Sequence, residues 1–407
     1  MNEPKLRFKA DDGSQFPDWE EKKIGDITLS HNAGVYIAKD NYGTGTNIIG
    51  VGDIYESDVI NGKQYRLAPV DSDEYILDEG DLVYGESSLV PEGIARTVCI
   101  SAAGKGTAFA WHTRRYKVDR TIINPYFLTL QVNYAKRVRN HLMRVCTRNA
   151  LTGMTTNEYF GTKVSVPCLP EQQKIAEFLS TIDTVIEKQK ETVSAWEERK
   201  KGVMQKLFSQ EVRFKADDGS EFPEWEEKKL KNILKEYKEY SAKDGSYEHV
   251  SLTKEGVVPK SERYERDFLV KDVDKKYRIT HLGDICYNPA NLKFGVICRN
   301  KYGDGIFSPI YVTFQVCKDM LPEFVEMLVT RRDFIEYALK YQQGTVYERM
   351  SVSPDDLLSI KVMVPCMTEQ QKIADCLVSL DEVIEKQKAT LAAWEELKKG
   401  LLQQMFV

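Results

Sequence analysis

Hydrophobic residues recur at helical spacing in two long stretches of the chain. The stretches cover residues 164–208 and 362–406. In each of them a series of positions seven residues apart is mostly apolar, which is typical of the seam of a coiled coil. The series are Ile175, Ile182, Gln189, Trp196 and Val203 in the first stretch, and Ile373, Leu380, Gln387, Trp394 and Leu401 in the second. We therefore predict two long helices whose seam residues serve in helix pairing or partner docking.

Local signals mark where these helices begin and how they pair. Thr368 fits the N-cap of a capping box, and Pro170 suits an early helical position in the first copy. At about 1.5 Å per residue, roughly 38 helical residues span roughly 57 Å. Gln189 and Gln387 stand in mid-seam, where a polar residue fixes register at some cost in stability. An antiparallel coiled coil is the predicted arrangement, and two helices that each dock on their own domain are the alternative.

Two internal repeats with different offsets organise the chain. Residues 7–24 return at 213–230, a shift of 206 positions, and residues 164–208 return at 362–406, a shift of 198. About 28 of the 45 positions in the second repeat are identical. Self-similarity of this kind indicates a duplicated architecture. The different offsets place the difference in length inside the segments between the repeats.

The segments between the repeats have diverged but keep faint common features. Residues 79–84 parallel 281–287, each with a Gly-Asp pair before a short apolar run. We predict two α/β (α+β) domains of one fold, related by a pseudo-two-fold repeat. The predicted boundaries are 1–163 for the first domain, 164–212 for the first helix, 213–361 for the second domain and 362–407 for the second helix. A constant frame with divergent inserts favours two readers of different targets, and neutral divergence is the alternative.

Composition narrows the class of protein. The chain has 407 residues, of which 42% are hydrophobic and 29% charged, and no apolar run reaches the roughly 20 residues of a membrane helix. The N-terminal residues lack the apolar core of a signal peptide, so we expect a cytoplasmic protein. The eight cysteines form no CxxC pair and the five histidines no HExxH motif, which argues against a metal site or a disulfide framework.

Charge is divided unevenly along the first domain. The total is −5, which by itself argues against nucleic-acid binding. However, residues 50–92 are strongly acidic and residues 111–148 strongly basic. A basic face with an acidic back could bind DNA locally, whereas a solvated charged helix surface is the plain alternative.

The repeated motifs resemble those of a known family. The sequences FPDWE at 16–20 and FPEWE at 222–226 precede the two domains, and LPEQQKIA at 169–176 and MTEQQKIA at 367–374 begin the two helices. Over essentially the whole chain this pattern resembles the specificity (S) subunits of type I restriction–modification systems, which belong to bacterial defence. The resemblance implies two target recognition domains, each of which reads one half of a split DNA sequence.

The resemblance also implies partners. The paired helices set the unread gap and dock two methyltransferase (modification) subunits, and restriction (translocase–nuclease) subunits join that complex. S-adenosylmethionine, ATP and magnesium are expected on those partners, with no cofactor, metal or catalytic residue on this chain. The expected binding partner of the chain itself is double-stranded DNA, with no membrane. The target sequence and the gap length do not follow from the residues.

Polar segments near the end of each domain are the first candidates for DNA contact. Exposed donors and acceptors read base edges, and Arg, Lys, Ser, Thr and Asn contact phosphates. In the family these segments lie near DNA, although an ordinary polar turn is the alternative. The candidates are Arg148, Asn149, Thr152, Thr155, Thr156 and Asn157 in the first domain, and Gln342, Gln343, Thr345, Tyr347, Arg349 and Ser351 in the second.

Further candidates follow the Gly-Asp strands or belong to the basic segment. Each of them has less support than the polar segments. They are Ser87 and Ser88 in the first domain, Asn288, Asn291 and Lys293 in the second, and Arg114 and Arg115 as phosphate contacts.

Other function classes fit the sequence less well. An adenine methyltransferase would explain the Asn-Pro pair at Asn288, but Ala290 and Asn291 replace the expected proline and aromatic residue, and an FxGxG cofactor loop is missing. A nuclease would need clustered acids with a lysine, and the charged run at 385–388 lies on the seven-residue repeat instead. A coiled-coil adaptor without DNA binding would not need two divergent inserts of one fold. We therefore predict a non-catalytic DNA-recognition subunit.

Overall fold

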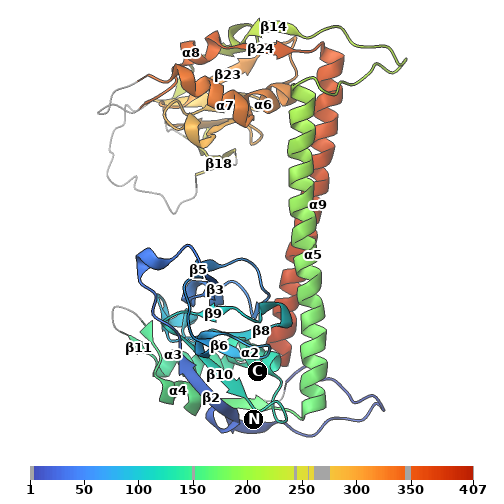
Figure 1. Ribbon diagram of the computed structural model, residues 1–407. Helices are drawn as coiled ribbons and strands as arrows, with labels where there is room; N and C mark the ends of the chain where they lie inside the picture. The colour runs from blue at the N-terminus through green and yellow to red at the C-terminus, as the bar shows by residue number, and fades with distance from the viewer. Residues whose placement is uncertain are drawn as a thin grey trace. The chain divides into compact units, whose positions relative to one another are not determined.

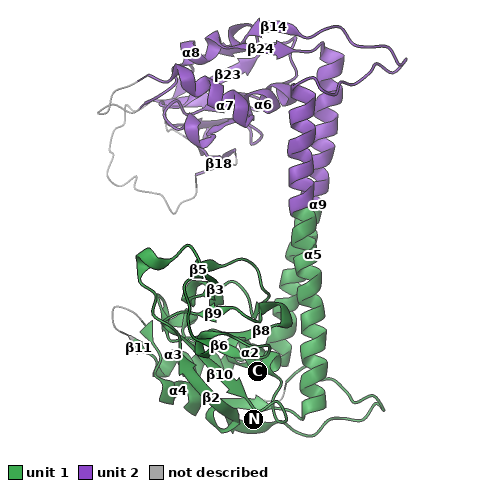
Figure 2. Ribbon diagram, viewed as in Figure 1, with its two compact units in different colours: residues 1–193, 387–407 green, residues 194–386 purple. Residues whose placement is uncertain are grey.

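The computed structural model describes residues 4–148, 152–242, 245–254, 256–260, 276–343 and 350–406. The chain divides into two compact units (Figure 2). Unit 1 comprises residues 1–193 together with 387–407, and unit 2 comprises residues 194–386. Each unit therefore combines a mixed α/β domain with parts of both long helices. Among the described residues, no helix is long and apolar enough to cross a membrane.

Both predicted long helices are present (Figure 1). Helix α5 spans Leu169–Phe208 and helix α9 spans Met367–Met405. Pro170 is the second residue of α5, where its missing N–H is harmless because that group has no partner in a first turn. The predicted Thr368 N-cap is wrong, because α9 already begins at Met367 and Thr368 lies inside its first turn.

Unit 1 is built from short strands with few helices. A five-stranded sheet has the order β2-β10-β6-β8-β4, and smaller sheets have the orders β5-β3-β9, β11-β12-β7 and β1-β13. The strands are β1 Glu20–Lys23, β2 Thr28–Ala33, β3 Thr46–Ile49, β4 Val59–Ile60, β5 Arg66–Ala68, β6 Leu82–Gly85, β7 Ser87–Ser88, β8 Thr97–Ile100, β9 Ala108–Phe109, β10 Thr113–Val118, β11 Thr147–Arg148, β12 Thr152–Gly153 and β13 Lys163–Val166. The described helices besides the long helices α5 and α9 are α1 Val51–Ile54, α2 Pro125–Tyr134, α3 Lys136–Val145 and α4 Thr156–Gly161.

Unit 2 contains a four-stranded sheet of order β15-β23-β20-β21, a five-stranded sheet of order β16-β19-β22-β17-β18 and the pair β14-β24. Its described strands are β14 Glu226–Lys229, β15 Leu234–Glu236, β16 Tyr240–Ser241, β17 Glu248–Leu252, β18 Val257–Pro259, β19 Tyr277–Thr280, β20 Ile285–Tyr287, β21 Ile297–Arg299, β22 Gly305–Phe307, β23 Val312–Val316 and β24 Lys361–Val364. Its described helices besides α9 are α6 Pro322–Thr330, α7 Arg332–Ala338 and α8 Pro354–Ser359, with the short 3₁₀ segment η9 at Leu292–Phe294.

The strand order of the two units matches in its central part. The antiparallel arrangement β2-β10-β6-β8 of unit 1 corresponds to β15-β23-β20-β21 of unit 2. In both units the strand after the lead-in pairs with the strand before the long helix, as β1 with β13 and β14 with β24. Two segments with little sequence similarity thus carry the same central sheet.

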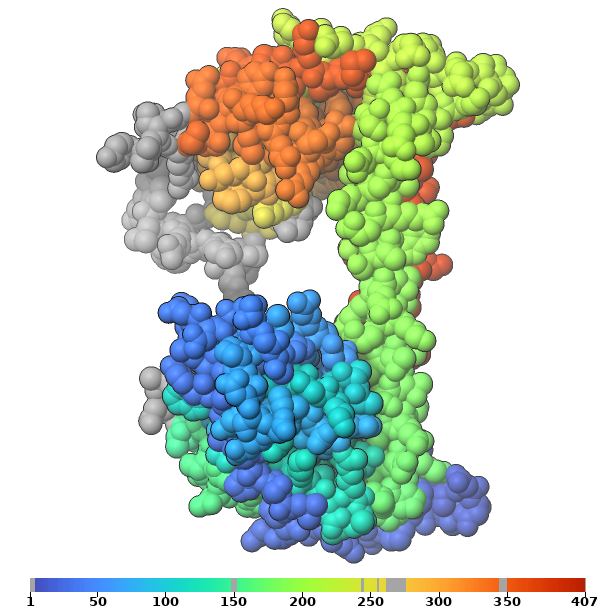
Figure 3. All heavy atoms as spheres, viewed as in Figure 1, coloured from blue at the N-terminus to red at the C-terminus, as the bar shows by residue number. Residues whose placement is uncertain are grey.

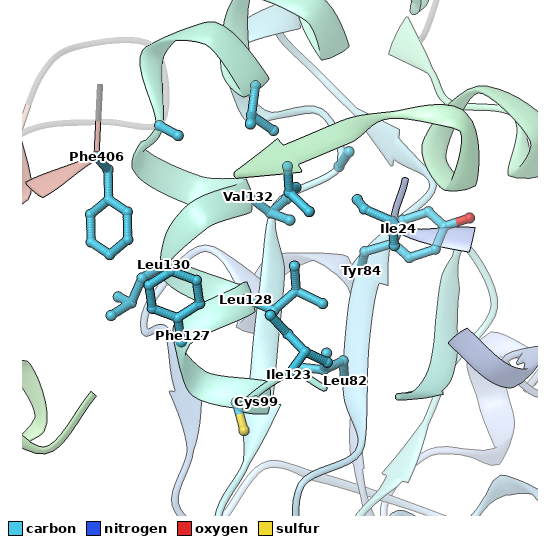
Figure 4. Packing of buried hydrophobic residues seen from close by; sticks show 14 of the residues in the cluster. Ile24, Leu82, Tyr84, Cys99, Ile123, Phe127, Leu128, Leu130, Val132 and Phe406 are labelled. Atoms are coloured by element: carbon cyan, nitrogen blue, oxygen red, sulfur yellow. The ribbon is translucent and has the colours of Figure 1, made fainter. Parts of the chain in front are cut away.

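The core of unit 1 joins the domain to both long helices. Helix α2 lies on the sheet with Phe127, Leu128 and Leu130 fully buried (Figure 4). The Phe406 ring, which follows the end of α9, lies 5.7 Å from the Phe127 ring and is also buried. The alternative in which each helix docks only on the domain preceding it is therefore wrong, because the end of α9 packs into the first domain.

A buried glutamate fixes the lead-in segment to the start of α5. The Glu171 side chain is fully buried and accepts hydrogen bonds from Arg7 Nε at 3.0 Å, Arg7 Nη2 at 2.8 Å and Trp19 Nε1 at 3.2 Å. A carboxylate without water needs such partners, and a two-pronged arginine contact supplies them with fixed geometry. This arrangement explains why Arg7, Trp19 and Glu171 all belong to the repeated sequences.

Unit 2 contains the same three contacts. Glu369 is fully buried and accepts from Arg213 Nε at 3.1 Å, Arg213 Nη2 at 2.9 Å and Trp225 Nε1 at 3.1 Å. The glutamine that follows this glutamate is also buried in both units. Its side chain accepts a hydrogen bond from the residue just before a domain helix, which is α2 in unit 1 and α6 in unit 2. Gln172 Oε1 accepts from Asn124 N at 2.8 Å, and Gln370 Oε1 accepts from Leu321 N at 3.0 Å. The repeated Glu-Gln pair is therefore a structural anchor for each domain.

Candidate nucleic-acid interface

Two polar segments that are far apart in the sequence meet in unit 1. Strand β7, which holds Ser87 and Ser88, pairs with β12, where Thr152 lies opposite Ser88. Strand β12 also pairs with β11, where Arg148 lies opposite Thr152. The main-chain N of Met154 donates to the carbonyl of Glu86 at 2.9 Å. The structure thus brings together the candidates Ser87, Ser88, Arg148 and Thr152 at one small sheet.

The same two segments meet in unit 2. The main-chain N of Val352 donates to the carbonyl of Pro289 at 3.2 Å, and the Tyr287 hydroxyl donates to the carbonyl of Val352 at 3.1 Å. Gln343 forms a two-way backbone bridge with Ser351, with both N–O distances at 2.9 Å. Candidates from the two predicted segments of this domain therefore also lie side by side. We call each of these places the domain edge: residues 86–88 with 152–157 in unit 1, and 288–293 with 342–343 and 350–353 in unit 2.

The edge residues of unit 1 divide into buried and exposed ones. Ser88 and Thr152 are buried, and Ser88 Oγ accepts from Val90 N at 3.2 Å, which holds the turn after β7. Thr155 is exposed, and its hydroxyl caps α4 by accepting from Glu158 N at 3.3 Å. Asn157 is exposed on the first turn of α4. The predicted polar segment therefore contains two short strands and the start of a helix, and Asn157 is exposed on that helix.

The edge residues of unit 2 show a similar division. Asn288 is buried, and its side-chain Oδ1 accepts from Ala290 N at 3.1 Å, so it stabilises the loop rather than facing a ligand. Asn291 is half-buried at the start of η9, whereas Lys293 is exposed. Gln342 is half-buried and Gln343 is exposed. The candidates Asn149, Thr345, Tyr347 and Arg349 lie outside the described residues.

Arg114 and Arg115 lie on β10 and already have partners. Arg114 Nε donates to Glu86 Oε1 at 2.6 Å, and Arg115 Nε donates to Asn32 Oδ1 at 2.9 Å. Strand β10 pairs with β6, so the basic segment and the acidic segment are neighbours in one sheet. The predicted basic face with a separate acidic back is wrong for this part of the domain, because opposite charges from adjacent strands pair with each other.

A buried ionic network links the first domain to the end of α9. The Asp58 carboxylate is buried and contacts Arg96 Nη2 at 2.9 Å, the Tyr134 hydroxyl at 2.8 Å and Lys398 Nζ at 3.3 Å. Lys398 also lies 2.6 Å from Asp183 on α5. Burial lowers the pKa of Lys398, but the two carboxylates outweigh burial, so its pKa is raised and the ammonium form is kept. The network fixes α9, α5 and the domain to each other within unit 1.

The seam residues of the long helices lie in several environments. Ile175 and Ile182 are buried in the core of unit 1, against which Trp394 also packs. Gln189 Nε2 donates to Gln387 Oε1 at 2.8 Å and to the Gln387 carbonyl at 3.0 Å. In unit 2, Ile373 is buried and Leu380 packs beside that core. Trp196 is half-buried, with the guanidinium of Arg199 5.2 Å from its ring centre.

Sequence reasoning did not single out two turns at the same end of the central sheets. The β9–β10 turn of unit 1 exposes Trp111, and the β22–β23 turn of unit 2 exposes Ile310. A large apolar residue between two short strands is the only sequence signal, and it is weak because such residues are usually buried. In the part of the chain that the structure describes, no cluster of histidine, cysteine or acidic residues could hold a metal ion.

Known proteins resemble this chain in sequence and in fold. Residues 17–194 match the family described as "Type I restriction modification DNA specificity domain". This segment of the chain is similar to that DNA specificity domain. The resemblance to specificity subunits that the sequence indicated is confirmed.

Curated relatives extend the similarity to nearly the whole chain. Two specificity subunits of Methanocaldococcus jannaschii, named for the type I restriction enzymes MjaX and MjaVIII, are each 23% identical to this chain. Both alignments cover 97% of this chain and 94% of the relative. The match therefore includes both domains and both long helices.

Solved structures share the fold. The crystal structure of a type I restriction–modification S subunit from M. genitalium has a TM-score of 0.57 at 13% identity, and the match covers 100% of this chain and 99% of that one. A chain from a structure of a type I restriction–modification system, described in terms of complex assembly and conformational transition, has a TM-score of 0.53 at 13% identity. That match covers 96% of this chain and 98% of the other. At these identities the likeness concerns the fold of a specificity subunit.

Proposed function

We propose that this chain is the sequence-specific DNA-binding subunit of a type I restriction–modification complex. The proposal rests on a contrast between the repeated contacts that anchor the two domains and the polar residues at the two domain edges. The same Arg–Trp–Glu contact anchors both domains, whereas the two domain edges hold different polar residues. A common scaffold with different donors and acceptors at one place suits two readers of different base sequences.

In this proposal each domain reads one half of a bipartite target with its edge. Exposed side-chain amides such as those of Asn157 and Gln343 contact base edges or phosphates. The buried members, Ser88, Thr152 and Asn288, hold the edge in shape. The chain itself is non-catalytic, and the methyl transfer and DNA cleavage belong to modification and restriction subunits that assemble with it.

The long helices set the gap between the half-sites and dock two modification subunits. We propose that they form an antiparallel coiled coil, with the pseudo-two-fold repeat providing one docking surface for each subunit. The hydrogen bonds between Gln189 and Gln387 support this pairing. The side chains of α5 also form an uncovered surface along the helix (Figure 3). Phe178 of α5 is partly exposed.

A binding assay with a matched genetic measurement tests the proposal. The purified chain is mixed with genomic fragments, with and without its modification subunit, and sequence-selective gel shifts are expected. Methylated adenines are then mapped in the host genome with the chain intact and deleted, and one bipartite motif is expected to lose methylation. No selective shift under either condition would refute the proposal. Methyl transfer by the chain alone would instead favour an enzyme.

The spacing role has its own test. One heptad is inserted after Lys190 in α5, and a second heptad is inserted directly before Gln387 in α9. The two inserts lie opposite each other in an antiparallel pair, so Gln189 and Gln387 remain paired. Seven helical residues add about 10.5 Å, or about three base pairs of B-DNA. The expected result is a longer unread gap between unchanged half-sites. Altered half-sites would contradict the spacing role while leaving DNA recognition intact.

A further inference from the structure

The β9–β10 turn of unit 1 holds an exposed aromatic cluster. Trp111 is 52% exposed and Tyr36 is 66% exposed, and their ring centres are 5.1 Å apart. The His112 ring stacks on Trp111 at 4.4 Å with an interplanar angle of 14°. Large exposed aromatic clusters are uncommon on protein surfaces and often mark interaction sites. This cluster therefore needs an explanation beyond the packing of the domain.

The backbone holds the cluster rigidly from both sides. Val35 N donates to the Phe109 carbonyl at 3.1 Å, and Trp111 N donates to the Val35 carbonyl at 2.7 Å. A Cβ on Gly34 would lie 2.1 Å from the Ala110 carbonyl oxygen, so only glycine permits this close approach. His112 has φ +66°, a conformation that costs energy for a residue with a side chain. These contacts fix the backbone of a turn in which Trp111 and His112 are both exposed.

The cluster adjoins the domain edge. Glu86 N donates to the His112 carbonyl at 2.8 Å, and Thr113 pairs with Gly85. Glu86 immediately precedes Ser87 and Ser88 of the edge. A ligand that contacts this edge therefore lies beside Trp111.

Unit 2 exposes an apolar residue at the corresponding turn. Tyr311 N donates to the Ser308 carbonyl at 3.0 Å, as Thr113 N donates to the Ala110 carbonyl at 3.2 Å. Ile310, which lies between Ser308 and Tyr311, is 59% exposed. The two turns differ in sequence, yet both present a large apolar side chain at the end of the central sheet that carries the edge. Trp111 is the second residue of its turn and Ile310 the third residue of its own, so the two turns share an exposed apolar residue but not its position.

We propose that Trp111 and Ile310 are apolar wedges that insert at a base-pair step of the bound duplex, one for each half-site. The inference rests on the proposed DNA-binding function and deepens it. Apolar side chains that enter between base pairs partly unstack them and bend the duplex, and bases stack readily on aromatic rings. Recognition then depends on how easily the duplex deforms at that step as well as on polar contacts.

Trp111 fluorescence tests the wedge directly. Of the five tryptophans, Trp19 and Trp225 are buried, and two others lie on the long helices. The emission of Trp111 is obtained as the difference between the full chain and Trp111→Phe. The probe is a duplex selected by the full chain from a random pool, and a scrambled duplex is the control. The selected duplex is expected to quench Trp111, and the scrambled duplex is not.

Affinity and base stacking provide the second measurement. Trp111→Ala is expected to weaken binding to the selected duplex roughly 5- to 100-fold, and Trp111→Phe less. With 2-aminopurine at successive steps of the half-site, emission should rise on binding of the unaltered chain and not with Trp111→Ala. Leu29→Ala is the matched control, because Leu29 is 70% exposed on β2 near the opposite end of β10. Ile310→Ser should have the corresponding effect at the other half-site.

The outcomes separate the two proposals. If the unaltered chain does not prefer the selected duplex to the scrambled one, the DNA-binding function fails and the wedge with it. If the chain is selective but Trp111→Ala binds equally well and 2-aminopurine stays stacked, the wedge alone is overturned. Quenching of Trp111 by the modification subunit without DNA would also overturn it, since the turn would then be a protein contact.

Discussion

Replacing Glu171 with glutamine should detach the lead-in segment of unit 1 from α5. The change keeps the size of the side chain but removes the charge that faces Arg7, whose side chain is only 19% exposed. Breaking a buried ion pair by altering one partner destabilises a protein by about 3–5 kcal/mol. Because Arg7 retains some contact with water and still donates to the Pro17 carbonyl at 2.7 Å, we expect about 3 kcal/mol, the lower end of that range.

Hydrogen exchange by mass spectrometry is the suitable assay, since it reports the loss of stability segment by segment. Peptides from residues 4–19 should exchange about a hundredfold faster in Glu171→Gln, which corresponds to roughly 3 kcal/mol. Glu369→Gln should have the same effect on residues 213–225 and none on residues 4–19, because Glu369 contacts Arg213 and Trp225 in unit 2.

Asp11→Asn is the matched control for the same helix turn. Asp11 pairs with Lys174 at 2.5 Å, but its side chain is 96% exposed, and exposed ion pairs contribute about 0–1 kcal/mol. If Glu171→Gln exchanged no faster than Asp11→Asn, the buried carboxylate would not be the anchor of the segment. The repeated Glu would then need another explanation.

Three further predictions concern the helices and one surface histidine. Gln189→Leu alone should lower the free energy of unfolding by about 1 kcal/mol, because it leaves the Gln387 amide without its partner. The double variant with leucine at both positions should regain or exceed the original stability in urea denaturation. A double variant less stable than Gln189→Leu would contradict this. Lys398→Met should lower the stability of unit 1 by about 1–3 kcal/mol, because it removes a partner of the buried Asp58 carboxylate. The control Lys399→Met should have almost no effect in the same assay, because Lys399 is exposed. Burial lowers the pKa of His281, but the hydrogen bond and charge of Asp304 outweigh it and raise the pKa above its usual 6.5. The pairing of protonated His281 with Asp304 therefore stabilises the folded protein fully below pH 6.5, and this stabilisation is lost as pH rises through the raised pKa. An NMR titration of His281 measures that pKa. An unchanged pKa of His281 in Asp304→Asn would exclude Asp304 as the cause.

The long helices could be predicted well from the sequence because their signal is local. A seven-residue series such as Ile175 and Ile182 needs only the periodicity of one helix to be recognised. The Thr368 cap failed because the start of α9 is set by contacts of Glu369 and Gln370 with residues far away in the chain. A helix terminus buried in a domain follows those contacts rather than the local capping preference.

The candidate edge could be predicted only in part, for a similar reason. Polar segments around Ser87 and Thr152 were recognisable, but their pairing as strands depends on the fold of the long segment between them, which the local pattern does not specify. The charge pattern misled because strands β6 and β10 are neighbours, which places Glu86 beside Arg114. Trp111 was missed because exposure of an aromatic residue is a tertiary property that a single sequence does not display.

The composition of unit 1 has a consequence for folding during synthesis. Its compact body includes residues 387–407, and Leu402, Met405 and Phe406 lie in its core. These residues leave the ribosome only after all of unit 2 has been made. Until the end of α9 has been synthesised, part of the apolar core of the first domain and the Asp58 carboxylate lack their α9 contacts. This favours a chaperone-bound or partly folded nascent chain. A messenger truncated before residue 387 would thus impair the first domain, although that domain's own sequence is complete.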